Sequence, residues 1–144
     1  MNTAIIIPEF LYHITPYKNL NKILKEGLIP DTKNSGICVL NGRKQRRRLV
    51  EKYGIQPIFL TTSPKLVVDT QAGPGWIKTY NPALLKIETT NLILEDEFDY
   101  LKEKWSKQYT SYETAIKVHP LGVHYICRHA IPKDSIKQVT FISL

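Results

Sequence analysis

The chain opens with a short strand pattern that gives way at once to a helical one. Residues Glu9–Thr15 form an aromatic and β-branched run that ends at Pro16, a residue without the backbone donor that a strand needs. From Asn19 the apolar residues recur three or four positions apart, and Gly27 stands where a helix commonly ends. The sequence therefore predicts one strand followed by one short helix.

The rest of the chain contains more strand patterns than helical ones. Strands are predicted at Ile58–Thr62, Leu84–Thr89, Leu92–Leu94, Tyr112–Val118, Val123–Cys127 and Ile136–Leu144. A second helix is predicted over Arg43–Tyr53, and the Gly- and Pro-containing stretch Asp69–Pro82 is predicted to be a mobile loop. Because strands outnumber helices and are not regularly interleaved with them, the pattern favours an α+β fold over a doubly wound α/β sheet.

The length and composition indicate one domain with one core. A chain of 144 residues with 42% hydrophobic residues is near the common size of a single domain, so 1–144 is predicted to be one unit. It contains no apolar run of about 18 residues, and Met1–Pro8 does not resemble a signal peptide, so a soluble cytoplasmic protein without membrane contact is expected. Cys38 and Cys127 lie far apart without further metal-ligand spacing, so no metal site is expected.

The basic residues favour a phosphate-bearing partner. Lys and Arg number 20 against 13 Asp and Glu, a formal net charge of +7. Five of these basic residues lie within Arg43–Arg48, and guanidinium groups bind phosphate through two hydrogen bonds. Arg43 and Arg46 are therefore candidates for holding a diphosphate, and the whole run could follow a nucleic-acid backbone. A solvated helix face is the simpler alternative.

Two histidines and one glutamate are candidates for chemistry. His13 and His124 lie inside predicted strands, where an imidazole can hold a substrate hydroxyl or transfer a proton. Either could equally be an ordinary residue on the polar face of its strand. Glu113 could stabilise a cation or accept a proton, and an exposed salt bridge is its alternative role.

Three consecutive hydroxyls end the second predicted strand. Thr61, Thr62 and Ser63 could bind ribose or phosphate oxygens, or they could cap a helix that begins near Pro64. The chain has no Walker loop, GxGxxG, HExxH or Ser-His-Asp spacing. These absences argue against the common nucleotide hydrolases, Rossmann enzymes and zinc proteases.

Four segments, in order, resemble the ADP-ribosyltransferase superfamily. Leu11–Pro30 is similar to its "YH-x-T" strand and "NL-x-x-IL-x-x-GL" helix, and Ile58–Pro64 to its second motif strand. Leu84–Leu94 resembles its "LLKI-x-T-x-x-LIL" strand, and Ile131–Val139 its closing "IP-x-x-x-I-x-x-V" segment. The nearest relatives by this resemblance are RNA 2′-phosphotransferases and DNA-targeting ADP-ribosyltransferase toxins. It implies a split β-sheet core of two half-sheets with short helices.

The resemblance also implies a function. It points to an NAD-dependent transferase that uses NAD as a substrate and modifies a nucleic-acid or protein acceptor. His13 would hydrogen-bond a ribose of NAD, and Tyr12 and Thr15 would line the same slot. Thr61, Thr62 and Ser63 match the family's second motif.

The third family position departs from the pattern. Active transferases usually carry a glutamate about seven residues before the "IP", where it stabilises the oxocarbenium-like transition state, but this chain has His124 there. Three readings stay open. Glu113 takes over, or His124 serves phosphotransferase-like chemistry, or the chain is a catalytically silent module of the same fold that binds a nucleotide, a nucleic acid or a host protein. A plain RNA-binding domain that uses the basic helix with Trp76 and Tyr80 is a further alternative.

Overall fold

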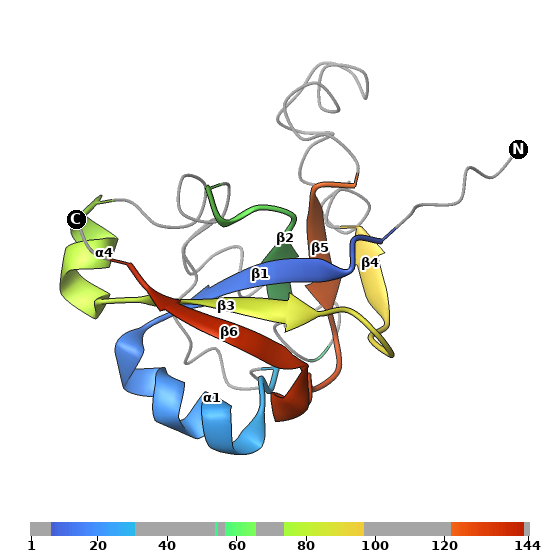
Figure 1. The fold of residues 1–144 in the computed structure, drawn as a ribbon, viewed down its shortest axis with the longest axis horizontal. Helices are drawn as coiled ribbons and strands as arrows, with labels where there is room; N and C mark the ends of the chain where they lie inside the picture. Colours follow the sequence, from blue (N-terminus) through green and yellow to red (C-terminus); the bar gives the residue numbers. More distant parts are fainter. Residues whose placement is uncertain (1–6, 31–53, 55–56, 66–73, 97–121, 143–144) are drawn as a thin grey trace, which may run out of the picture.

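A computed structural model describes residues 7–30, 54, 57–65, 74–96 and 122–142 (Figure 1). Its elements, in chain order, are β1 (Phe10–Thr15), η1 (Tyr17–Asn19), α1 (Leu20–Glu26), β2 (Ile58–Thr61), α4 (Pro74–Tyr80), β3 (Ala83–Glu88), β4 (Leu94–Asp96), β5 (His124–Cys127), η2 (Lys133–Ser135) and β6 (Ile136–Phe141). Few short helices accompany an antiparallel sheet, so the predicted α+β class is confirmed.

The sheet has six strands in the order β4-β5-β2-β1-β3-β6, and each neighbouring pair is antiparallel. β1 pairs with β3 along its whole length, and β2 does the same with β5. In contrast, β1 and β2 share a single paired position, Tyr12 opposite Thr61. The sheet therefore consists of two three-stranded parts, β4-β5-β2 and β1-β3-β6, and we call their junction the seam.

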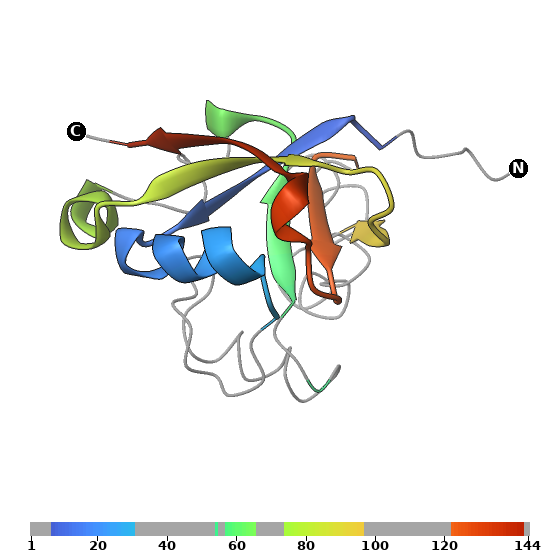
Figure 2. The same cartoon turned by 60° about the horizontal axis from the view of Figure 1, so that its bottom comes forward.

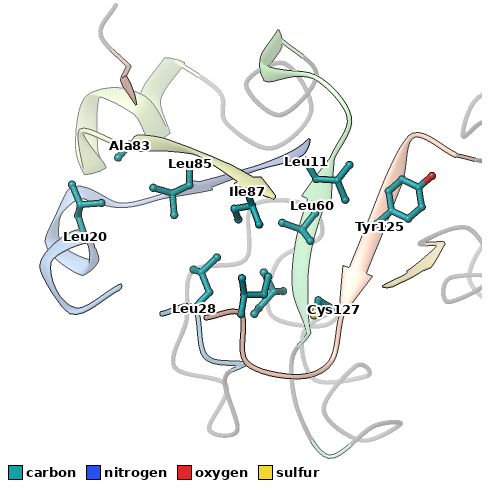
Figure 3. Packing of buried hydrophobic residues seen from close by; sticks show 11 residues of the cluster. Leu11, Leu20, Leu28, Leu60, Ala83, Leu85, Ile87, Tyr125 and Cys127 are labelled. Carbon is teal, nitrogen blue, oxygen red and sulfur yellow. The ribbon is translucent and has the colours of Figure 1, made fainter. Parts of the chain in front are cut away.

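The main core lies between the sheet and α1. Figures 1 and 2 show α1 along one face of the sheet, and Leu20 is its buried contact. Figure 3 shows the cluster on this face, which comprises Leu11, Leu20, Leu28, Ile58, Leu60, Ala83, Leu85, Ile87, Tyr125, Cys127 and Ile131. Because successive strand residues alternate between faces, Ile14 of β1 faces the other way and packs with Leu84 and with Ile77 of α4.

Gly27 joins the end of α1 to the segment before η2. Its φ is 88° and its ψ is −178°, a conformation open essentially only to glycine. A β-carbon at this position would collide with the carbonyl oxygen of Ile131. The close approach lets Leu28 and Ile131 exchange two backbone hydrogen bonds, of 3.0 and 2.8 Å. Two segments far apart in the sequence can therefore pair through their backbones because residue 27 has no side chain.

Most predicted elements in the described residues occur near their expected positions, but two predictions need correction. The predicted loop Asp69–Pro82 is wrong from Pro74 onward, because α4 occupies Pro74–Tyr80. Proline is tolerated in the first turn of a helix, so Pro74 begins this helix rather than breaking it. The predicted strand Leu92–Leu94 is displaced, because β4 spans Leu94–Asp96.

The displacement of β4 has a local cause. Asn91 adopts a φ of 66°, and the Leu92 amide donates a hydrogen bond of 3.1 Å to the Thr89 carbonyl. The first residue of the predicted strand, Leu92, therefore belongs to a turn. Ile93 follows at 74% exposure. The predicted helix Arg43–Tyr53 and strand Tyr112–Val118 lie outside the described residues. In the part of the chain that the structure describes, no helix is long and apolar enough to span a membrane.

Candidate functional site

His13 crosses the seam between the two parts of the sheet. Its ring Nδ1 lies 2.8 Å from the backbone oxygen of Phe59 on β2. A carbonyl oxygen only accepts hydrogen bonds, so Nδ1 carries the proton and donates it. In the neutral ring, Nε2 is then the atom with the lone pair. The imidazole thus links β1 to β2 and presents a defined acceptor.

The environment of His13 favours this neutral ring. Burial lowers the pKa of His13 below its ordinary value, because the charged imidazolium loses its hydration. The hydrogen bond to Phe59 opposes this effect but is the smaller of the two. At neutral pH the Nε2 atom can therefore accept a hydrogen bond from a hydroxyl group.

Thr61 lies in a polar row across three neighbouring strands. It is directly opposite Tyr12 of β1 and directly opposite His124 of β5. Residues at directly opposed positions point to the same face, so these three side chains share one face of the sheet. Thr61 is fully buried, and its Oγ1 has no hydrogen-bond partner among the described residues. A buried hydroxyl in this state has hydrogen-bonding capacity that a ligand can use.

Strand alternation separates His13 from that row. His13 neighbours Tyr12 on β1, so its side chain starts from the opposite face, where it lies across from Leu85 of β3. Its ring turns toward the seam, as the bond to Phe59 requires. The structure thus places the first-motif histidine and the second-motif threonine at the same seam, on opposite faces of the sheet.

The other predicted binding residues have different surroundings. Thr15 ends β1 and is buried, opposite Ala83 on the α1 face. Thr62 follows β2, and its amide bonds to the Val123 carbonyl at 3.1 Å. Helical residues begin at Pro64, so Ser63 occupies the position of an N-cap residue. Only Thr61 of the three hydroxyls lies within the sheet.

Three predicted site residues cannot be placed in this geometry. Arg43, Arg46 and Glu113 lie outside the described residues, as does the whole basic run Arg43–Arg48. Among the residues that are described, no group of three His, Cys, Asp or Glu side chains is arranged to hold a metal ion.

Asp96 and Tyr125 form a buried polar pair that sequence reasoning missed. They lie directly opposite each other on β4 and β5, at 7% and 2% exposure. Asp96 accepts a hydrogen bond of 2.8 Å from the Gly122 amide. Burial, and secondarily the negative charge of Asp96, raise the pKa of the Tyr125 phenol. Tyr125 therefore stays protonated at neutral pH.

The Tyr125 hydroxyl is a second buried oxygen with no hydrogen-bond partner among the described residues. In Figure 3 it points away from the rest of the labelled cluster. The sequence signal for Asp96 was weak, because it stands among other acidic residues that follow the apolar run. Only its pairing with a core residue of β5 distinguishes it from a solvated carboxylate.

The comparisons with known proteins do not assign the chain to a family. No protein-family model matches it, and no curated protein sequence matches it.

Proposed function

We propose that this protein is an NAD-dependent ADP-ribosyltransferase-like enzyme whose nucleotide site is the seam between β1 and β2, with a nucleic acid or a protein as acceptor. The observation that carries the proposal is that His13 and Thr61 both lie at this seam, on opposite faces of the sheet. These are the residues that the family resemblance assigns to its first and second motifs. Their placement at one seam depends on the strand order and is independent of the motif match itself.

The division of the sheet also supports the proposal. The resemblance implies a core of two half-sheets, and here two three-stranded parts share only one paired position. In addition, the Gly27–Leu28 end of the first motif helix bonds to Ile131 at the start of the closing motif. Segments that resemble one family in sequence are thus also neighbours in space.

In this proposal a nucleotide lies at the seam and contacts His13 from one face of the sheet and Thr61 from the other. Beyond Tyr12 and Thr61, no further ladder pair closes β1 against β2. A ribose placed there would donate a hydroxyl hydrogen bond to Nε2 of His13, since Nδ1 is already committed to Phe59. The Thr61 hydroxyl would take a second sugar or phosphate oxygen.

The proposed reaction exchanges one bond at the ribose C1′ atom. The glycosidic bond to nicotinamide breaks, and its electron pair leaves with neutral nicotinamide. An acceptor oxygen or nitrogen forms the new bond to C1′ and releases its proton. His13 holds the sugar during this exchange, which favours the reaction by fixing the orientation of C1′ toward the acceptor.

The residue that stabilises the charge of the transition state is the undecided part of the proposed reaction, because His124 stands at the glutamate position. His124 lies opposite Thr61, at the position where the resemblance expects a glutamate. An imidazole can accept the proton of the acceptor, but a neutral ring stabilises a developing oxocarbenium charge less than a carboxylate does. We therefore retain both candidates for the missing charge, His124 in phosphotransferase-like chemistry and Glu113 as a replacement carboxylate.

A catalytically silent module is the second candidate function. The observation in its favour is the same replacement of glutamate by His124. Such a module would bind ADP-ribose, or a nucleic acid, at the seam without transferring anything. It differs from the enzyme in one measurable respect, the release of nicotinamide.

The test is nicotinamide release from labelled NAD, with calorimetric binding of ADP-ribose measured in parallel. His13→Asn keeps a donor near Phe59 but removes the Nε2 acceptor, so we expect about tenfold weaker ADP-ribose binding. Thr140→Val, at an exposed position on β6, should change nothing. Binding of ADP-ribose without release of nicotinamide would replace the enzyme by the silent module, and absence of both would overturn the proposed site.

Two further variants separate the catalytic candidates. If Glu113 supplies the charge, Glu113→Gln abolishes nicotinamide release and leaves ADP-ribose binding intact. If His124 acts instead, His124→Ala has that effect and Glu113→Gln does not. Full turnover in both variants would exclude both residues.

A further inference from the structure

Three aromatic side chains gather at one end of the sheet, away from the seam. Figures 1 and 2 show that α4, the start of α1 and the C-terminal end of β6 lie at this same end. Tyr17 comes from η1, Tyr80 from the end of α4, and Phe141 from the end of β6. We call these three residues, together with Lys18, the aromatic corner.

Two rings of the aromatic corner, Tyr17 and Phe141, are open to solvent and close to each other, and the third ring, Tyr80, is half-buried. The centroids of Tyr17 and Phe141 are 6.0 Å apart, and their planes are tilted by 47°. The two residues are 52% and 58% exposed. Lys18 places its Nζ 6.0 Å from the centroid of the Tyr80 ring. Exposed aromatic residues that cluster in this way are typical of a binding surface rather than of core packing.

The charge around the aromatic corner has one sign. Lys18, Lys22 and Lys78 are exposed. No Asp or Glu occurs in η1, α4 or β6, and the one acidic residue of α1 is Glu26, the last residue of the helix whose start lies at this end. An anionic ligand is therefore favoured at the corner.

We propose that the aromatic corner docks a single-stranded nucleic acid. Aromatic rings beside lysines supply the two interactions that such a strand needs, because bases stack on ring faces and phosphates pair with ammonium groups. An acidic peptide would use the lysines but would leave the ring faces without a stacking partner. Its residues are distinct in the sequence from the basic run Arg43–Arg48.

The corner also has a spatial relation to the seam. Tyr17 lies four residues beyond His13, which corresponds to about 13 Å of extended chain. A docked strand would thus place a neighbouring nucleotide within reach of the seam. This identification of the strand as the transferase acceptor rests on the proposed function, whereas the binding itself does not.

The experiment measures fluorescence anisotropy of a labelled oligo(dT) of about 12 nucleotides, a length suited to such surfaces. The double variant Tyr17→Ala/Phe141→Ala should bind at least about tenfold more weakly than the unmodified protein, because stacking is lost. Tyr17→Phe keeps the ring and should bind as the unmodified protein does. Ile93→Ala removes an even more exposed apolar side chain from the segment between β3 and β4 and serves as the control.

The lysine contribution has its own matched pair. Lys18→Gln should weaken binding severalfold and reduce its salt dependence between about 50 and 200 mM salt. Lys133→Gln, in η2 at the opposite end of β6, should leave both unchanged.

Three outcomes would overturn the proposal. They are unchanged binding in the double variant, equal competition by polyglutamate, and a dimer in solution that the double variant abolishes. Failure of the proposed transferase would show separately, as absent nicotinamide release from a protein that still binds the oligonucleotide through the corner.

Discussion

At the seam, the imidazole of His13 adds a side-chain bond between β1 and β2, which share a single ladder pair. Its Nδ1 donates to the backbone oxygen of Phe59. The same bond fixes the tautomer of the ring. One side chain therefore bridges the two parts of the sheet, and the bond leaves Nε2 as the hydrogen-bond acceptor of the ring. Thr61, one residue row away, adds a buried hydroxyl.

Thr61→Val tests whether that hydroxyl serves a ligand. The substitution keeps the shape and removes a buried oxygen that has no partner among the described residues. We expect the free energy of unfolding to rise by about 1 kcal/mol and ADP-ribose binding to weaken by about five- to tenfold. Thermal unfolding and calorimetry measure the two effects, with Thr140→Val as the exposed control. A loss of stability with unchanged binding would assign the hydroxyl to the fold instead.

The lowered pKa of His13 predicts a pH dependence of stability. In the unfolded chain the imidazole takes up a proton near pH 6.5, whereas in the folded protein it does so only at lower pH. Stability from this group is thus fully present above about pH 6.5 and is lost as the pH falls, by at most about 1.4 kcal/mol per pH unit. Denaturant unfolding between pH 7 and the folded pKa of His13 measures the slope.

The matched variant for this slope is His13→Asn, which does not titrate. Carboxyl groups contribute to both proteins, so the difference between the two slopes isolates His13. Parallel slopes would contradict the burial of a neutral imidazole at the seam.

At the scale of elements, short-range chemistry sets where helices and strands end. Gly27 ends α1 because its backbone conformation and its contact with Ile131 both exclude a β-carbon. Asn91 in a left-handed turn delays β4, and Pro74 starts α4. These three residues decide boundaries that hydrophobic periodicity alone predicts imprecisely.

Gly27→Ala should be strongly destabilising. It forces a side chain into a conformation reserved for glycine and against the Ile131 carbonyl, so we expect a loss of about 3 kcal/mol. Gly54→Ala is the matched control, because Gly54 also has a positive φ, of 75°, but no atom lies within 4 Å of a β-carbon built there. Its loss should be about 1 kcal/mol. Equal melting temperatures of the two variants would show that the contact with Ile131 is unimportant.

At the scale of the whole molecule, the sheet is two antiparallel units with one shared pair. β3 is bonded on both sides, to β1 and β6, and β5 is bonded to β2 and β4. At the seam, by contrast, β1 and β2 are joined by a single paired position. The seam is therefore the place where the two units can separate with the fewest broken hydrogen bonds.

Hydrogen exchange should reveal this division. Backbone amides of β3 and β5 should be the most protected, while amides of β1 and β2 that face the seam exchange faster, because fewer ladder bonds cover them. Saturating ADP-ribose should slow the seam amides more than those of β6. Uniform protection across all six strands would contradict the division of the sheet.

Much of the α+β character is encoded locally. β1, α1, β2, β3, β5 and β6 follow from apolar period and from Pro and Gly positions, all within a few residues of chain. The candidate site depends more on contacts between residues far apart in the sequence. His13 and Thr61 could be singled out by type, but Asp96 could not be separated from its acidic neighbours until its partner Tyr125 was known.

The sequence by itself determined the elements and the residues with chemical potential, because side-chain period and turn chemistry act between near neighbours. The tertiary structure alone decided that β1 lies between β2 and β3 and meets β2 at a single position. Strand order depends on contacts between residues dozens of positions apart, which no local pattern specifies. That order turns a histidine in a strand into the group that crosses the seam, with Nδ1 bonded to the backbone oxygen of Phe59 and Nε2 left as a hydrogen-bond acceptor.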